Sequence, residues 1–339
     1  MATDDQKNAS RRIQQREIAE LAGVSISTVS RVLSSAPGIS EAVQQRVLAA
    51  AAQLGYQRGT ARPASRIQNI TLLTSLQLAP GLDPFHAAVL SGVEQAAAQE
   101  GLHLSYASVG GPDSTLDRLR QNAVDGLLLL SIDEPELIDQ ITALALPTVM
   151  INVDHRELPI DAFLPDNRLG ALLAMRHLIA CGHRRILHIT SLQRRTIRRR
   201  AEAYQVALAE AGIAYDPQLV LDIPINAESS YEAMRQRLAK KQLDFTAVFC
   251  ANDLAAMGVM RAVQEAGLRI PHDLSVVGFD DIATSAYLSP PLTTVRIEAA
   301  ELAALAVRRL IERAAAPERT SIRVSLACRL IERQSVARI

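Results

Sequence analysis

The sequence predicts two folds in one chain: an all-α headpiece with a helix-turn-helix, followed by a larger α/β domain built of two parallel-sheet lobes. Two observations lead to this prediction. Residues 17–33 hold two short amphipathic segments separated by Gly23, which is the pattern of a helix-turn-helix. From Ile70 onward, short apolar runs alternate with helical segments, which is typical of parallel sheets covered by helices.

Composition indicates a globular protein. The chain has 339 residues, 48% of them apolar, enough for two or three domains. No apolar run approaches the ~18 residues that span a membrane, and the N-terminal segment lacks the apolar centre of a signal peptide. We therefore expect a cytoplasmic protein without membrane contact. Cys181, Cys250 and Cys328 are far apart in apolar contexts, so we expect buried thiols and no disulfide or metal site.

Charge is distributed unevenly along a chain whose formal net charge is zero. Residues 1–67 carry nine basic and five acidic side chains, a net charge of +4, which leaves −4 on the remainder. A basic head on an acidic body favours a polyanionic partner for the head alone.

The helix-turn-helix is predicted from local signals. The first helix, at about 15–22, has an apolar face and ends at Gly23, because glycine tolerates the left-handed conformation of a helix end. Ser25 stands at the N-cap position of the second helix, at about 26–33. Val29, Val32 and Leu33 form the apolar stripe of that helix. This packing turns a second set of side chains outward: Ile26, Ser27, Thr28, Ser30 and Arg31.

The outward side chains suit the major groove of DNA. Arg31 can donate two hydrogen bonds to guanine O6 and N7. Thr28 and Ser30 are short donors suited to phosphate oxygens. Ile26 and Ser27, at the helix start, would meet base edges or a thymine methyl. The alternative is an ordinary helical hairpin with a solvated outer face.

A third helix and a linker complete the N-terminal part. Ser40-Glu41 begins the third helix and Gly55 ends it. The apolar face of this helix completes a small core. The segment Gln57–Asn69 is predicted to be a linker.

The α/β domain contains more strands than one open sheet of typical size, so we expect two similar lobes. There is no G-x-G-x-x-G after a strand, no G-x-S-x-G elbow, no Walker loop and no metal-ligand spacing. We therefore expect no cofactor, no metal and no enzymatic activity. The apolar runs are ITLLTSL, LHLSYA, VDGLLLL, LPTVMIN, RRILHIT, TAVFCAND and LSVVGFDD.

Polar residues follow these runs, at the sheet edge where open α/β proteins bind ligands. Carboxylates, an amide, an arginine and an aromatic ring suit a small polyhydroxylated ligand. The alternatives are helix capping for Asp253, Asp281 and Asp166-Asn167, and a core or surface role for His86 and His155. The candidates are Asp83-Pro84-Phe85-His86, Asp154-His155, the arginines up to Arg200, Asn252-Asp253 and Asp280-Asp281.

Five arginines crowd seven positions before a predicted helix. Two interpretations remain open: a solvated surface run, or a site for an anionic effector such as a phosphorylated or acidic sugar. The five are Arg194, Arg195, Arg198, Arg199 and Arg200.

The string at residues 22–33, AGVSISTVSRVL, resembles the DNA-binding motif of the lactose-repressor (LacI/GalR) family of bacterial transcription regulators. The resemblance covers about residues 14–336. It continues through Ser40-Glu41, Leu54-Gly55-Tyr56, Pro84-Phe85, Val124-Asp125-Gly126, Asp166-Asn167-x-x-Gly170, Gly182-His183-Arg184-Arg185-Ile186, Asn252-Asp253, Gly278-Phe279-Asp280-Asp281, Pro291-Leu292-Thr293-Thr294-Val295 and Arg333-x-Ser335.

The resemblance implies a domain plan. Residues 1–58 would form the headpiece, 59–69 a hinge, and 70–339 an effector domain similar to periplasmic sugar-binding proteins. Its N-lobe would comprise about 70–165 and 293–318, and its C-lobe about 166–292 and 319–336. Family members usually carry Ala-Arg-Ser-Leu in the hinge and wedge the leucine into the minor groove. This chain has Ala61-Arg62-Pro63-Ala64 and lacks that leucine.

The resemblance also implies functional residues. Effector contacts would come from Phe85, Asp154, Arg200, Asn252 and Asp280. His183 would be structural. His155 stands where many sugar-binding relatives have arginine, which disfavours a simple pentose. DNA contacts would come from Ser25, Ile26, Ser27, Thr28, Ser30, Arg31 and Arg62.

The function implied is that of a sequence-specific regulator, a repressor of carbohydrate-utilisation genes. It would bind a near-palindromic operator as a homodimer and respond to a sugar or sugar phosphate. A nucleoside or an acidic metabolite is the alternative effector. No leucine heptad follows Arg333, so we expect no tetramerising coil.

Overall fold

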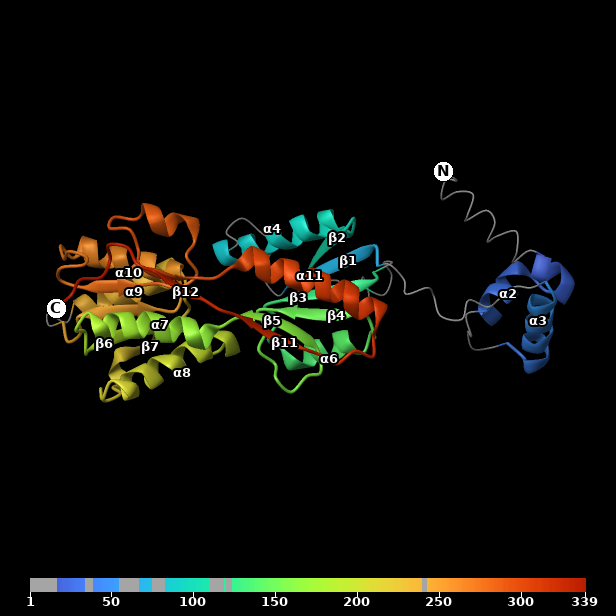
Figure 1. Cartoon of the computed structure of the whole chain (residues 1–339), viewed down its shortest axis with the longest axis horizontal. Helices are drawn as coiled ribbons and strands as arrows, with labels where there is room; N and C mark the ends of the chain where they lie inside the picture. Colours follow the sequence, from blue (N-terminus) through green and yellow to red (C-terminus); the bar gives the residue numbers. More distant parts are fainter. Residues whose placement is uncertain are drawn as a thin grey trace. The chain divides into compact units, whose positions relative to one another are not determined.

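The computed structural model describes residues 17–33, 39–54, 67–74, 83–109, 119, 124–239 and 243–339. The chain divides into two compact units, Met1–Ser65 and Arg66–Ile339 (Figure 1). The expected boundaries at 58 and 59 lie outside the described residues, as do Arg62 and most of the hinge. The side chains of Ser30 and Leu33 also lie outside them.

The first unit contains the predicted helix-turn-helix. A helix covers residues 17–22, followed by α2 (Ile26–Leu33) and α3 (Glu41–Gln53). Gly23 ends the first helix with φ +61°, Gly23 N donates to Glu20 O at 3.4 Å, and Val24 N donates to Ala19 O at 3.0 Å. This pair of bonds is the Schellman motif of a helix C-terminus. The core of the unit is Ile18, Ala19, Ala22, Val29, Val32, Val47, Ala50 and Ala51.

The first lobe of the second unit is built on a six-stranded parallel sheet in the order β11-β5-β4-β3-β1-β2. Its strands are β1 (Asn69–Thr74), β2 (His103–Ser108), β3 (Gly126–Leu130), β4 (Thr148–Ile151), β5 (Asp161–Pro165) and β11 (Arg323–Leu326). Its helices are α4 (Pro84–Gln99), α6 (Pro135–Thr142) and α11 (Ala299–Ala315).

The second lobe has a four-stranded parallel sheet in the order β7-β6-β8-β9, beside the antiparallel pair β10 and β12. Its strands are β6 (Ile186–Thr190), β7 (Val220–Asp222), β8 (Ala247–Cys250), β9 (Ser275–Val277), β10 (Thr294–Arg296) and β12 (Arg329–Ile331). Its helices are α7 (Asn167–Ala180), α8 (Arg195–Glu210), α9 (Ala227–Leu238) and α10 (Asp253–Glu265), with 3-10 turns η1 (Pro217–Leu219) and η2 (Ala283–Tyr287).

The inner strands of both sheets are buried on two faces, which explains why β1, β3, β4, β6 and β8 are largely apolar runs. In β3, Leu128 packs toward α4 and α11, whereas Leu129 packs on the opposite side with α6. In β8, Phe249 faces the α7 and α8 side and Val248 the α9 and α10 side. The helix pair α4 and α11 lies against one face of the first sheet (Figure 1). Gly92 permits their close approach, since a Cβ there would lie 2.8 Å from Ala303 Cβ.

The chain crosses between the lobes three times, after β5, after β10 and after β11 (Figure 1). The expected crossings near 293 and 319 differ from those seen. β10 pairs with β12 in the second lobe, so the return to the first lobe comes after Arg296. Arg323–Leu326 pairs with β5, so the last crossing follows β11. β10 has only three residues and β11 is only partly buried, so no continuous apolar run marks either strand.

Candidate functional site

The outer face of α2 begins at a serine cap. Ser25 Oγ accepts a hydrogen bond from Thr28 N at 3.1 Å, and it lies 2.8 Å from the hydroxyls of both Ser27 and Thr28. Ser25 therefore satisfies a helix-start N–H and orders the hydroxyls beside it. Ile26 is 49% exposed, and Ser27 and Arg31 are also exposed. A large apolar side chain in water beside an arginine and hydroxyls fits a surface that meets another molecule.

Replacing Ser25 by alanine is expected to loosen the headpiece. The variant loses the hydrogen bond to Thr28 N, and loss of an N-cap costs about 1 kcal/mol. Amide hydrogens of α2 should exchange roughly fivefold faster, as measured by hydrogen-exchange mass spectrometry of the full chain. Ser27→Ala is the control, because it removes a hydroxyl that contacts Ser25 Oγ but keeps the bond from Thr28 N to Ser25 Oγ. Equal exchange in both variants would contradict the capping role.

Arg200 is the centre of the polar site in the second lobe. It lies at 4% exposure on the first turns of α8. Its Nε donates to Asn167 Oδ1 at 2.8 Å, and its Nη1 donates to Ala251 O and lies 3.4 Å from Asp280 Oδ1. The guanidinium also stacks 3.6 Å from the centre of the Phe279 ring, a favourable cation–π contact.

Asp280 approaches Arg200 from the end of β9 in an unusual conformation. Its φ is +110°, a region that L residues rarely adopt. Burial raises the pKa of this carboxyl well above its usual range, and the charge of Arg200 opposes the rise. The charge of Arg200 favours the ionised form of Asp280, and the two side chains form a buried pair beside a flat aromatic ring. Such a group can bind vicinal hydroxyls and stack on an apolar sugar face.

Strained backbone marks the same edge of both sheets. Among the described residues, five other than glycine have positive φ, and four of these follow a strand end: Ser131, Asn152, Asp280 and Asp281. Strain of this kind concentrates at functional sites. In both lobes, residues with a positive φ therefore lie at the carboxyl ends of the strands, where open α/β proteins bind ligands.

Phe85 lies at the start of α4 in the first lobe, 8% exposed. Its N–H is capped by Asp83 Oδ1 at 2.8 Å. A chain of polar contacts runs beside it: His86 Nδ1 is 3.2 Å from Asp83 Oδ2, His86 Nε2 is hydrogen-bonded to Ser131 Oγ at 2.9 Å, and Asn152 Nδ2 donates to the same hydroxyl at 3.0 Å. His86 is thus a buried residue whose polar contacts are made within the protein, as the core interpretation predicts.

Asp154 is 5% exposed and is surrounded by arginines. Arg199 Nε is 2.8 Å from Asp154 Oδ2, Arg156 Nε is 3.3 Å from Oδ1, and Arg323 Nη1 is 3.6 Å from Oδ1. Burial alone raises the pKa of Asp154, but the hydrogen bond and charge of Arg199 lower it below the usual value.

The structure brings Arg200 and Asp280 together and places Asn252 beside them. Asn252 follows Ala251, whose carbonyl binds Arg200, but its own side chain caps α10 by accepting from Ala255 N at 2.9 Å. Phe85 and Asp154 lie in the first lobe, and within the described part of the chain the hydrogen bonds of Arg200 go to Asn167, Ala251 and Asp280 instead.

Two residues of the Arg200 site, Asn167 and Phe279, are absent from the five effector contacts that the resemblance implies. Asp166 caps α7 as one interpretation of Asp166-Asn167 predicts, by accepting from Leu169 N at 2.9 Å, but Asn167 turns inward to Arg200. Phe279 belongs to the matched Gly278-Phe279-Asp280-Asp281 motif, which is the signal that could have found it. A Cβ on Gly170 would lie 2.6 Å from the Phe279 ring, so this glycine makes room for the stack.

Several other polar candidates are structural. Asp253 is fully buried and binds Ile282 N, Ser285 Oγ and Thr294 Oγ1; burial raises its pKa to about 6. Asp281 lies 2.5 Å from Arg296 Nε and 2.6 Å from Arg333 Nη2. The structural role expected for His183 is consistent with its contacts, since its ring lies within 2.9 Å of Thr246 Oγ1 and 3.1 Å of Ala337 O.

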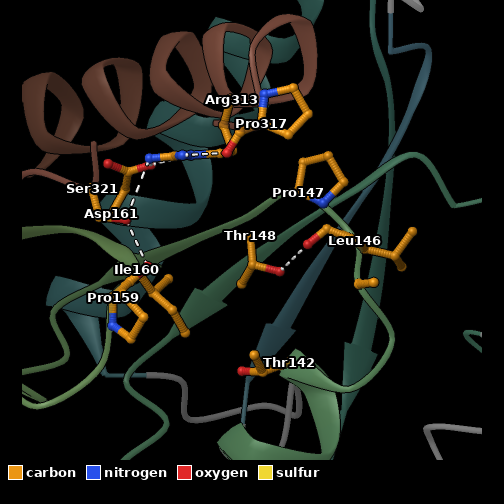
Figure 2. A pocket seen from close by; sticks show the side chains of 11 residues that line it. Thr142, Leu146, Pro147, Thr148, Pro159, Ile160, Asp161, Arg313, Pro317 and Ser321 are labelled. Carbon is orange, nitrogen blue, oxygen red and sulfur yellow. Dashed lines mark hydrogen bonds and ion pairs between the residues drawn. The ribbon is translucent and has the colours of Figure 1, made fainter. Parts of the chain in front are cut away.

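A separate hollow lies in the first lobe between the starts of β4 and β5 and the end of α11 (Figure 2). Its volume is about 280 Å³. Asp161 binds Arg313 Nε at 2.8 Å, Ser321 Oγ donates to Pro159 O at 2.6 Å, and Thr148 Oγ1 donates to Leu146 O at 2.8 Å. Its main polar side chains are therefore bonded within the protein, as the dashed lines show (Figure 2).

The described residues contain no cluster of three or more His, Cys, Asp or Glu side chains able to hold a metal ion. In the same part of the chain, no helix has the length and apolar character needed to cross a bilayer.

A headpiece with a capped, outward-facing second helix, joined to a two-lobed α/β domain with a polar site, defines a ligand-responsive DNA-binding regulator. Comparisons agree with this class. A family model described as "Bacterial regulatory proteins, lacI family" matches residues 15–59, and one described as "Periplasmic binding protein-like domain" matches residues 175–336. The chain belongs to the lacI family of bacterial transcriptional regulators.

Relatives support this assignment over nearly the whole chain. A ribose operon repressor from Haemophilus influenzae is 35% identical over 95% of this chain and 98% of its own length. An HTH-type transcriptional repressor PurR from Photobacterium profundum is 33% identical, over 88% and 91%. The relatives are repressors, which confirms the expectation of a regulator and not an enzyme.

Solved structures agree. A complex of the transcriptional regulator CelR with cellobiose is 30% identical with a TM-score of 0.72, covering 95% of this chain and 99% of that one. A lac repressor dimer bound to operator and the anti-inducer ONPF is 27% identical with a TM-score of 0.71, covering 94% and 98%. The predicted fold class is thereby confirmed.

Proposed function

We propose that this regulator binds a near-palindromic operator as a cytoplasmic homodimer and represses carbohydrate-utilisation genes under the control of a small sugar-like effector. The observation that carries the effector assignment is the buried site of Arg200, Asp280, Asn167 and Phe279. It combines paired charges with an aromatic face at the carboxyl ends of the strands. A ribose operon repressor among the relatives makes D-ribose the first compound to test, even though His155, in place of the usual arginine, counts against a simple pentose.

The headpiece supplies the DNA contacts in this proposal. Arg31 reads a guanine, Ile26 and Ser27 meet base edges, and Thr28 approaches the phosphates. Ser25 acts mainly by capping α2. Effector and operator affinities are coupled reciprocally, typically by 1–3 kcal/mol.

A neutral effector is favoured over an anionic one. The arginine run faces carboxylates: Arg194 pairs with Asp133, Arg195 with Glu157 and Arg199 with Asp154. An anion would have to displace these carboxylates to reach the guanidiniums. The solvated-surface interpretation of the run is also incomplete, since these three arginines bind the opposite lobe.

The proposed function is tested with DNA from the region upstream of the gene. Full-length protein is expected to bind it, and affinity should fall steeply as salt rises, because phosphate contacts release counterions. Fluorescence anisotropy with D-ribose, other sugars, sugar phosphates and nucleosides identifies the effector as the compound that changes operator affinity. Operator binding that no salt concentration weakens, or a shift caused by sugar phosphates alone, would contradict the proposal.

A further inference from the structure

Three arginines at the start of α8 reach across to the first lobe. Arg194 Nε is 3.1 Å from Asp133 Oδ2. Arg195 Nη1 is 3.3 Å from both carboxylate oxygens of Glu157. Arg199 Nε is 2.8 Å from Asp154 Oδ2. We call these six residues the interlobe clasp. Each pair joins a residue of the second lobe to a loop that follows β3 or β4 in the first lobe.

The position of these arginines is unfavourable within α8 itself. A helix N-terminus carries a partial positive charge, which repels cations in the first turn. The first turn of α8 has no acidic residue, and its N-cap, Arg194, makes no side-chain cap bond. Contacts beyond the helix must offset this repulsion, and the carboxylates of the first lobe do so. Arg199 also pairs with Glu202 of its own helix at 2.9 Å.

Burial differs among the three pairs. Asp154 is 5% exposed, Asp133 20% and Glu157 69%. Exposed pairs contribute little, whereas a buried carboxylate depends strongly on its partner. Asp133 Oδ1 and Arg194 Nη2 are buried with no hydrogen-bond partner in the described part of the chain. We therefore expect the Arg194–Asp133 and Arg199–Asp154 pairs to contribute most of the attraction between the lobes. The exposed Arg195–Glu157 pair should contribute little.

Arg198 is the arginine of the run between Arg195 and Arg199 that does not pair with the first lobe. It belongs to the same run, but its Nε and Nη2 donate to Leu192 O at 3.2 and 2.9 Å. That carbonyl lies in the second lobe, so Arg198 adds charge without joining the lobes. It provides a matched control for the other three.

We propose that the interlobe clasp holds the two lobes together without effector, so that ionic strength tunes the effector affinity of the Arg200 site. The coupling to effector rests on the proposed function; the holding of the lobes does not. The three chain crossings act as the hinge. Each ion pair that stabilises this arrangement of the lobes lowers the free energy that effector binding must supply to populate it.

The clasp is tested first without ligand. Spin labels are placed in the full chain at Glu136→Cys on α6 and Gln205→Cys on α8, both exposed positions. Cys181→Ser removes the native thiol that is not fully buried. Pulsed dipolar spectroscopy measures the distance between the lobes at about 0.1 M and about 1 M NaCl, where the Debye length falls from about 10 Å to about 3 Å.

The expected result is a short, narrow distance distribution at low salt and a longer, broader one at high salt. The triple variant Arg194→Gln/Arg195→Gln/Arg199→Gln should give the longer distribution at both concentrations, and Arg198→Gln should match the unchanged chain. Arg194→Asp should lengthen the distance, and adding Asp133→Arg should restore it. Identical distributions for the triple variant and the unchanged chain at both concentrations would overturn the clasp.

Calorimetric titration with D-ribose then tests the coupling. The clasp predicts that ribose affinity falls by about three- to tenfold between the two salt concentrations, although ribose carries no charge, and that the triple variant loses this salt dependence. Salt-independent ribose binding by the unchanged chain would overturn the coupling. If ribose does not bind while the spectroscopy gives the expected result, the effector assignment fails and the clasp stands.

Discussion

Replacing Arg31 by alanine is expected to abolish specific operator binding while leaving effector binding intact. Arg31 is exposed on α2, where its guanidinium can form a bidentate pair with guanine. Such a pair is worth about 1–3 kcal/mol, so two half-sites lose about 2–6 kcal/mol, roughly 30-fold to more than 10⁴-fold in affinity. Fluorescence anisotropy with operator and non-operator DNA measures the loss, which should be confined to the operator.

Arg46→Ala is the matched control. Arg46 is an exposed arginine of α3, so the variant loses the same charge from the headpiece but leaves the outer face of α2 unchanged. It should weaken operator and non-operator binding by similar, small factors. If Arg31→Ala behaves like Arg46→Ala, Arg31 contributes only charge and base reading must lie elsewhere. If Arg31→Ala also loses ribose binding, misfolding explains the result.

The headpiece could be predicted from sequence because its signals are local. Gly23 and Ser25 lie two residues apart in the chain and decide where one helix ends and the next begins. The continuous apolar runs of β3 and β8 likewise reflect burial on two faces, which any parallel sheet requires. In contrast, β10 and β11 are short and carry arginines, so the lobe crossings could not be placed from the pattern.

The candidate site was harder to predict because partners distant in sequence decide each role. Asp253 and Asp280 both follow strands, yet one is bound by η2 and β10 while the other meets Arg200. The arginine run raised the hypothesis of an anionic effector, because the sequence alone does not reveal that Asp133, Asp154 and Glu157 oppose it. Charge patterns along a chain identify charged surfaces, but tertiary structure decides what they bind.

Replacing Arg200 by glutamine is expected to eliminate effector binding and to destabilise the second unit. The variant leaves Asp280, 9% exposed, without its opposite charge, and breaking a buried pair costs about 3–5 kcal/mol. Burial already raises the pKa of Asp280, and Arg200 restrains that rise. Without Arg200 the folded variant holds a proton that the unfolded chain releases. The free energy of unfolding of the variant should therefore fall further as pH rises above the range in which an ordinary carboxyl group titrates. Urea unfolding at about pH 5 and about pH 8 would measure this fall.

The double variant Arg200→Gln/Asp280→Asn separates stability from recognition. It removes both buried charges, so most of the lost stability should return and the pH dependence should disappear. Ribose binding should not return, because the amides supply neither the guanidinium stacked on Phe279 nor the carboxylate beside it. Ribose binding by the double variant at the affinity of the unchanged chain would mean that the pair only stabilises the fold. Lost binding in a stable, pH-insensitive double variant would place effector recognition at Arg200 and Asp280 themselves.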